Sequence, residues 1–275
     1  MKILQHQWKV FCSAVMFLTR IPVPNYEPYN PKWLQQSPRY FTYVGAVVGL
    51  LSGIVCIACF LIGNVYLAAI AYTISSILIT GAFHEDGFAD MCDAYGGGYT
   101  IEKKLTIMKD SRLGTYGALG LFLIVILKIF LVAEILNNYL ALAHIFNLNI
   151  TAYKLFCFLP IAVLVHAVSR FAPLLIMQNL KYVADVDASK SKPMANQKLP
   201  IKSLIIAILP FISFAFILPQ FTIIALAGTL ITSLYMAWLC KKHLGGYTGD
   251  CLGATQQLTE ITIYLQLVIL LNTII

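Results

Sequence analysis

The chain has 275 residues, 59% of them hydrophobic and 11% charged, whereas a soluble domain carries about 25% charged residues, so soluble enzymes, secreted disulfide scaffolds and disordered chains are excluded. Its net charge of +7 does not indicate nucleic-acid binding, because Lys and Arg gather in a few links between apolar runs. These runs are close to the roughly 20 residues that cross a bilayer. The composition therefore predicts a single membrane-embedded domain, residues 1–275, with an all-α polytopic fold.

The first predicted element is an amphipathic helix ahead of the first span. Its apolar side chains recur at helical spacing, opposite a polar face of Lys2, Gln5, Lys9 and Ser13: they are Ile3, Leu4, Trp8, Phe11, Cys12, Val15 and Leu18. The helix is expected to lie in the membrane interface and to end at Ile21–Pro24. A tilted eighth membrane segment is the alternative.

About seven transmembrane helices are predicted from apolar segments. They cover residues 43–62, 65–83, 115–136, 154–177, 201–218, 221–240 and 261–275. The last is short and needs tilt or a thin bilayer to span. Links rich in Lys and Arg alternate with links that hold neither, which predicts that the N-terminus and every basic link face the cytoplasm.

Acidic residues are concentrated where the second apolar segment ends. Glu85, Asp86, Asp90 and Asp93 fall there, and the last three share one face if the helix continues past Phe83. Like charges on one face repel one another. We therefore expect these four acids to bind Mg²⁺, which is held by carboxylates together with substrate phosphates; a solvated acidic helix end is the alternative.

The residues that follow fit phosphate chemistry. Gly97 lies in a glycine triplet that lets backbone approach a ligand, and Gly114 lies just before the third span, whose amides favour an anion. Between them runs Lys109-Asp110-Ser111-Arg112, which supplies two cations. Together with the acids, these residues predict a site for Mg²⁺ and a diphosphate.

Other polar residues lie in or near the spans. Thr248 and Asp250 occur in a glycine-rich link and are expected to bind substrate, with Asp250 as a further metal ligand or a helix cap in the alternative readings of that position. Glu260 is placed in the same cytoplasmic link. Arg170 is expected to reach substrate phosphate or an acid, with a snorkelling side chain as the alternative. His84 is expected to act as a general base or as an orienting group, and His166 as a packing residue or a participant. No chemistry is assigned to Lys128 and Glu134.

Two central motifs resemble those of cobalamin synthases: Phe83–Asp93 (FHEDGFADMCD) and Lys104–Gly117 (KLTIMKDSRLGTYG). Phe17–Pro24 (FLTRIPVP) and Gly246–Asp250 (GYTGD) resemble the terminal signatures of that family, so the resemblance covers the chain from end to end. It departs at Ala94, where glycine is expected.

The resemblance implies a Mg²⁺-dependent transferase of the bacterial or archaeal cytoplasmic membrane. Such an enzyme joins the 5′-hydroxyl of α-ribazole, or of its 5′-phosphate, to adenosylcobinamide-GDP. It releases GMP and leaves adenosylcobalamin or its 5′-phosphate, late in vitamin B12 nucleotide-loop assembly. A homo-oligomer is compatible with the sequence.

The expected roles follow from this reaction. The four acids would hold Mg²⁺ against the diphosphate; Lys109, Arg112 and Arg170 would neutralise charge; and His84 or Asp110 would accept the hydroxyl proton. A CDP-alcohol phosphotransferase is the alternative enzyme, although its motif stops here at Asp86-Gly87. A transporter is disfavoured because the middles of the predicted spans carry almost no charge.

Overall fold

The computed structural model describes residues 2–24, 26, 28, 30–145, 158–184, 194 and 198–274, and within them it contains helices and a single isolated β-bridge. The helices are α1 (Lys2–Leu18), α2 (Pro31–Gln36), η1 (Ser37–Tyr40), α3 (Phe41–Ile62), α4 (Val65–Thr80), α5 (Phe83–Gly97), α6 (Ile101–Met108), α7 (Thr115–Ile145), α9 (Phe158–Ser169), α10 (Ala172–Asn179), α11 (Ile201–Ile217), α12 (Pro219–Leu244) and α13 (Gly249–Ile274). The all-α prediction is confirmed.

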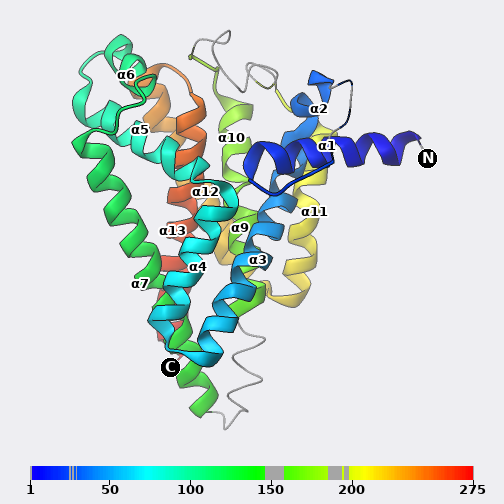
Figure 1. The fold of residues 1–275 in the computed structure, drawn as a ribbon, viewed down its shortest axis with the longest axis vertical. Helices are drawn as coiled ribbons and strands as arrows, with labels where there is room; N and C mark the ends of the chain where they lie inside the picture. Colours follow the sequence, from blue (N-terminus) through cyan, green and yellow to red (C-terminus); the bar gives the residue numbers. More distant parts are fainter. Residues whose placement is uncertain are drawn as a thin grey trace.

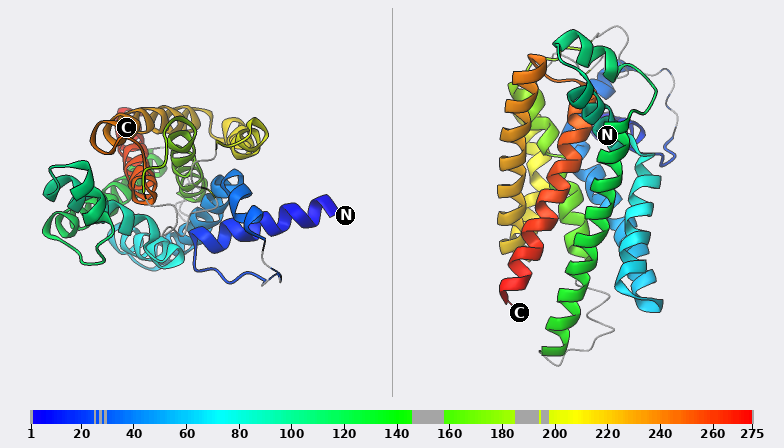
Figure 2. Two further views of the ribbon diagram at one scale, coloured as in Figure 1. Left: turned by 90° about the horizontal axis from the view of Figure 1, so that it is seen from above. Right: turned by 90° about the vertical axis from the view of Figure 1, so that its left-hand side faces the viewer.

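The seven predicted apolar segments lie mainly on helices that run side by side as one bundle (Figure 1, Figure 2), although residues 154–157 of the fourth and residue 275 of the last are outside the described part. Five helical stretches are long and apolar enough to cross a membrane by themselves: 31–62, 115–142, 158–179, 219–244 and 249–274. α11, with 17 residues, is shorter. The chain is therefore a multi-pass membrane protein.

The last span differs from the prediction. It does not begin at residue 261, because α13 starts at Gly249 and continues for 26 residues. Thr248 caps this start: its Oγ1 accepts a hydrogen bond from the Cys251 amide at 3.3 Å. Glu260 is therefore part of a membrane-length helix and not of a cytoplasmic link.

The second span also differs, because α4 does not continue past Phe83. Gly81 and Ala82 both adopt the left-handed conformation, with φ of 66° and 59°, and α5 leaves α4 at 90°. The amide of Ala82 donates to the Ile77 carbonyl at 3.0 Å, the bond that closes a helix end of this kind. The bend lays α5 across one end of the bundle, beside α6 (Figure 1).

Small residues bring α3 and α9 close together. Gly45, Gly49 and Gly53 recur every four residues and so share one face of α3. A Cβ at Gly49 would lie 2.8 Å from the carbonyl carbon of Ala162, and one at Gly53 would lie 2.7 Å from Leu159 Cδ1. This face permits the close backbone approach that membrane helices use in place of a hydrophobic driving force.

Helix α1 lies beside the bundle end and projects away from it (Figure 2). Its C-terminal half packs on the bundle through Val10, Ala14 and Leu18, whereas Ile3 and Leu4 are about 80% exposed at its start. This position agrees with the predicted interfacial helix and not with an eighth membrane segment.

Candidate active site

Helix α5 presents its acids to two different sides. Asp86 is exposed and Asp90 is half-buried, while Glu85 is only 7% exposed. The four predicted metal ligands therefore do not converge on one point. Among the residues that the structure describes, no three His, Cys, Asp or Glu side chains are grouped closely enough to hold a metal ion by themselves.

Asp250 joins the exposed side of α5. The backbones of α5 and α13 cross at two glycines: a Cβ at Gly87 would lie 2.9 Å from the Asp250 Cα, and one at Gly253 would lie 3.1 Å from the His84 carbonyl oxygen. Asp250, half-buried in the first turn of α13, thus lies beside Asp86 and Asp90. We call these three residues the acidic group.

The acidic group is electrostatically unfavourable as it stands. Burial, together with the neighbouring carboxylates of Asp250, Asp86 and Asp93, raises the pKa of Asp90 to about 7. The ion pairs Arg112–Asp110 and Lys128–Glu260 involve other carboxylates. Three exposed or half-buried carboxylates side by side are suited to a divalent cation that is shared with a phosphate ligand.

Asp93 has a different role from the one predicted for it. Its two carboxylate oxygens accept hydrogen bonds from the Gly114 amide at 2.7 Å and the Gly117 amide at 2.8 Å. These amides belong to the start of α7, where a carboxylate satisfies unpaired donors and complements the helix dipole. Asp93 therefore fixes α7 against α5, and the Gly114 amide that was expected to bind substrate is already used.

Glu85 points into the bundle. Its Oε1 accepts a hydrogen bond from Gln257 Nε2 at 3.0 Å, and its Oε2 is buried with no hydrogen-bond partner among the described residues. Gln257 also donates to Gln256, at 2.9 Å. Gln256 in turn donates to Glu260 Oε2 at 2.8 Å, so a continuous chain of polar side chains connects Glu85 with Glu260.

Glu260 is the centre of a buried ionic network that sequence reasoning missed. Its Oε1 lies 2.6 Å from Lys128 Nζ, and both side chains are at most 4% exposed. His166 Nδ1 lies 3.8 Å from Glu260 Oε2, and Arg170 donates to the same His166 nitrogen at 3.0 Å. The expectation of nearly uncharged span interiors was wrong, because Lys128 and Glu260 lie well inside α7 and α13.

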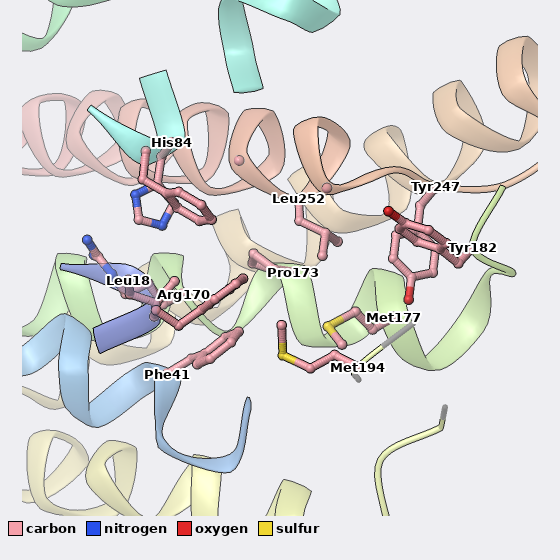
Figure 3. Close-up of a pocket in the computed structure, with 14 residues that line it drawn as sticks. Leu18, Phe41, His84, Arg170, Pro173, Met177, Tyr182, Met194, Tyr247 and Leu252 are labelled. Atoms are coloured by element: carbon pink, nitrogen blue, oxygen red, sulfur yellow. The ribbon is translucent and has the colours of Figure 1, made fainter. Parts of the chain in front are cut away.

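His84 and Arg170 meet at one end of a largely apolar pocket, with Tyr182 and Tyr247 at its other end (Figure 3). Both His84 and Arg170 are at most 4% exposed. Burial first, and then the nearby Arg170 guanidinium, lower the pKa of His84, so its imidazole is neutral. Gly249 also lines this pocket and precedes Asp250, which places the pocket next to the acidic group.

The Lys109–Arg112 segment lies in the exposed link between α6 and α7. Arg112 Nη2 donates to Asp110 Oδ2 at 2.6 Å, and the Arg112 side chain is 88% exposed. This hydrogen bond lowers the pKa of Asp110 to about 2. Lys109 caps the end of α6, Gly97 is exposed at the end of α5, and Ser111 is exposed in the link between α6 and α7.

The structure therefore brings Asp86, Asp90 and Asp250 together in the acidic group, and His84 and Arg170 together at one end of the neighbouring pocket. It places Glu85 and Asp93 in supporting hydrogen bonds, and Thr248 in a helix cap. Glu260 could have been found as an acid flanked by Leu258, Ile261 and Ile263, but its partner Lys128 is too distant in sequence for any pattern to join them.

Comparisons with known proteins agree over nearly the whole chain. A family model described as cobalamin-5-phosphate synthase matches residues 10–268. An adenosylcobinamide-GDP ribazoletransferase of Vibrio cholerae is 37% identical over 271 residues, which cover 98% of this chain and 97% of the relative. Proteins of the same name from Shewanella piezotolerans and Leptospira interrogans are 38% and 36% identical; the matches cover 96% and 98% of this chain, and 96% and 99% of the relatives. No solved structure matches.

Proposed function

Because this chain belongs to the cobalamin-5-phosphate synthase family, we propose that it joins α-ribazole, or its 5′-phosphate, to adenosylcobinamide-GDP and releases GMP. The observation that carries the proposal is the acidic group of Asp86, Asp90 and Asp250 beside a pocket that ends in His84 and Arg170. Carboxylates that bind a metal and a buried guanidinium are the groups that a diphosphate substrate requires.

The reaction exchanges the phosphoanhydride bond of the diphosphate for a new phosphoester bond. The 5′-hydroxyl oxygen forms a bond to the phosphorus that carries the cobinamide, the bond from that phosphorus to the oxygen of GMP breaks, and the hydroxyl proton leaves. The protein must therefore hold the diphosphate, orient the hydroxyl in line with the bond that breaks, and accept one proton.

The acidic group is the proposed site of Mg²⁺. Asp86, Asp90 and Asp250 would hold the ion, and the repulsion among these carboxylates, which adds to burial in raising the pKa of Asp90, is the property of this structure that fits a cation. When bound, Mg²⁺ would neutralise charge on the diphosphate and stabilise the departing GMP. Asp93 and Glu85 support this site through α7 and α13, because both are engaged in hydrogen bonds with these helices.

His84 is the proposed proton acceptor. Burial keeps its imidazole neutral, so one ring nitrogen carries a free lone pair at the end of the pocket, whereas the Asp110 carboxylate is held by Arg112 on the exposed link and has its pKa lowered to about 2. Arg170 would donate to a phosphoryl oxygen or to the substrate at the end of the pocket. Lys109 and Arg112 lie on the exposed link and would contact the outer part of the diphosphate.

The site is proposed to face the cytoplasm of a prokaryotic cell. Helices α1, α2, α5 and α6 and the start of α13 lie at one end of the bundle (Figure 1). The helix ends, short helices and links at this end carry most of the Lys and Arg residues, including Lys103 and Lys104 in α6 and Lys241 and Lys242 in the last turn of α12. Basic links remain on the cytoplasmic side of a membrane.

The test is turnover by detergent-purified protein with adenosylcobinamide-GDP and α-ribazole. GMP release that requires Mg²⁺, stops with EDTA and is accompanied by one equivalent of cobamide is the expected result. Folded protein that releases no GMP with either α-ribazole or its 5′-phosphate would contradict the proposed reaction. GMP release that continues unchanged in EDTA would contradict only the proposed metal.

A further inference from the structure

A second cavity, of about 420 Å³, lies beside α1 and is lined in part by Thr19–Pro24, the last residues of the N-terminal signature. Pro22 and Pro24 disfavour a helix in this segment, because proline lacks a backbone donor. The chain turns back along α1, where Trp8 Nε1 donates a hydrogen bond to the Tyr26 hydroxyl at 2.8 Å. The cavity is therefore enclosed between α1 and the segment that returns along it.

Two cations line this cavity, and both are held in place. The Lys9 ammonium lies 4.9 Å from the ring centroid of Trp33 and 5.1 Å from that of Tyr26. Contact with an aromatic face orients an ammonium without cancelling its charge. Arg20 is exposed, and its side chain extends over Gly81, where a Cβ would lie 2.9 Å from Arg20 Cγ. The cavity thus presents two oriented positive charges.

The aliphatic hydroxyl groups of the lining are already used within the chain. Ser13 donates to the Lys9 carbonyl at 3.0 Å, and Thr19 donates to the Val15 carbonyl at 2.8 Å. Lys9 and Arg20 are the charged residues among those of the lining that the structure describes. A ligand would therefore be recognised by its negative charge, and a phosphate ester suits a guanidinium together with an ammonium.

Arg20 also joins this cavity to the helix that carries part of the acidic group. Its amide donates to the Ile79 carbonyl at 2.7 Å, in the last turn of α4, where carbonyls lack partners within the helix. Its side chain covers Gly81 in the bend, and the Ala82 carbonyl of the same bend accepts from the Asp86 amide at 2.9 Å. An anion bound by Arg20 therefore lies beside the bend that orients α5.

We propose that Arg20 and Lys9 form a binding site for a phosphate ester. One source of this group is an anionic phospholipid, because α1 lies in the interface and Trp8 and Met16 are each 52% exposed beside the cavity. The other source is the nucleotide half of adenosylcobinamide-GDP. That source rests on the proposed function and is supported by the packing of Arg20 on the bend before α5.

Binding is measured with the detergent-purified full-length chain in EDTA, which keeps the acidic group free of metal. The probes are dihexanoyl phosphatidylglycerol, an anionic lipid, and GDP. Wild-type protein should bind at least one of them, and Arg20→Gln and Lys9→Gln should each weaken that binding about tenfold, the loss typical of one charge-assisted hydrogen bond. Lys202→Gln, which removes an exposed cation at the start of α11, is the matched control and should bind as wild type does.

The pattern of losses identifies the source of the phosphate. A loss confined to phosphatidylglycerol assigns the site to lipid, and the uncharged head group of dihexanoyl phosphatidylcholine should then bind more weakly. A loss confined to GDP assigns it to the nucleotide, and Arg20→Gln should then raise KM for adenosylcobinamide-GDP about tenfold without changing KM for α-ribazole. Losses for both probes support a site open to either. Wild-type protein that binds neither probe, or variants that bind both as wild type does, would overturn the proposal.

Arg20→Lys separates the site from folding, because it keeps the charge and loses the planar fork. It should recover part of the binding that Arg20→Gln loses, and with Lys9→Gln it decides the proposal if Arg20→Gln does not fold. Binding requires no turnover. Wild-type protein that binds a probe through Arg20 and Lys9 but releases no GMP therefore contradicts only the proposed function, and protein that releases GMP but binds both probes independently of these residues contradicts only this site.

Discussion

Asp90 is the residue at which the electrostatics of the site are concentrated. It lies between Asp86 and Asp93 on α5 and faces Asp250 on α13, and these neighbours together with burial raise its pKa to about 7. Asn has the same shape without the charge. We therefore expect Asp90→Asn to fold normally but to release GMP about 100-fold more slowly or worse, the loss typical of a removed electrostatic contact in a transition state.

The measurement is GMP release together with the thermal unfolding temperature, each with and without Mg²⁺. Glu102→Gln, an exposed acid on α6, is the control and should behave as wild type. Wild-type stabilisation by Mg²⁺ should be lost in Asp90→Asn. An Asp90→Asn protein that keeps wild-type turnover and Mg²⁺ stabilisation would remove Asp90 from the site.

The raised pKa of Asp90 also predicts how stability depends on pH. An unfolded Asp loses its proton near pH 3.9, whereas folded Asp90 keeps its proton to about pH 7. Between these values the folded state binds more protons, so its stability falls as pH rises. In EDTA, the unfolding temperature of the wild type should fall more steeply than that of Asp90→Asn from about pH 4 to about pH 7. Parallel curves for the two proteins would contradict the assignment.

At the scale of helices, the Lys128–Glu260 pair joins α7 to α13. Both side chains are buried and 2.6 Å apart, so removal of one partner leaves an uncompensated charge inside the bundle. Such a change typically destabilises a protein by about 3–5 kcal/mol, whereas loss of both partners is much less harmful. We expect Lys128→Met and Glu260→Gln each to unfold at a lower temperature, and the double variant to recover most of the loss.

Unfolding of the detergent-solubilised proteins measures this coupling. Glu134→Gln, a half-buried acid on the same α7, is the control for loss of a carboxylate and should have a small effect. Because Gln256 and Gln257 connect Glu260 to Glu85, the single variants should also release GMP more slowly. Additive losses in the double variant would show that the two side chains act independently.

For the whole molecule, the sequence predicted the positions of the helices well and the contacts between them poorly. Runs such as 43–62 and 221–240 were recognised because apolar length alone decides membrane insertion. The bend at Gly81–Ala82 was missed because Ala seldom adopts positive φ. The acids on α5 predicted a site at this end of the bundle, but their division into the acidic group, the cap at Asp93 and the internal bond of Glu85 depends on how α5 crosses α13 and α7.

Contacts between side chains that are far apart in the sequence could not be predicted either. No periodicity connects Lys128 with Glu260, or Tyr72 with Tyr264, whose hydroxyl oxygens lie 2.5 Å apart in the core. The sequence places Glu260 in a link because the apolar run begins only at residue 261. In the structure, α13 begins earlier and packs its polar side chains against the other helices instead of exposing them to water. Local pattern therefore predicts which residues are helical, and the packed bundle decides which polar residues are structural.

The orientation of the bundle is open to a direct test. The N-terminal helix and the C-terminus lie at opposite ends (Figure 1), and the basic links lie at the end that carries the acidic group. Because such links remain in the cytoplasm, alkaline phosphatase fused after Ile275 should be active in a bacterial host, and a fusion after Lys242 should be inactive. A fusion at Gly63, in the tight link between α3 and α4, should also be active. The reverse pattern would place the site on the outer face, away from the nucleotides that the proposed reaction consumes.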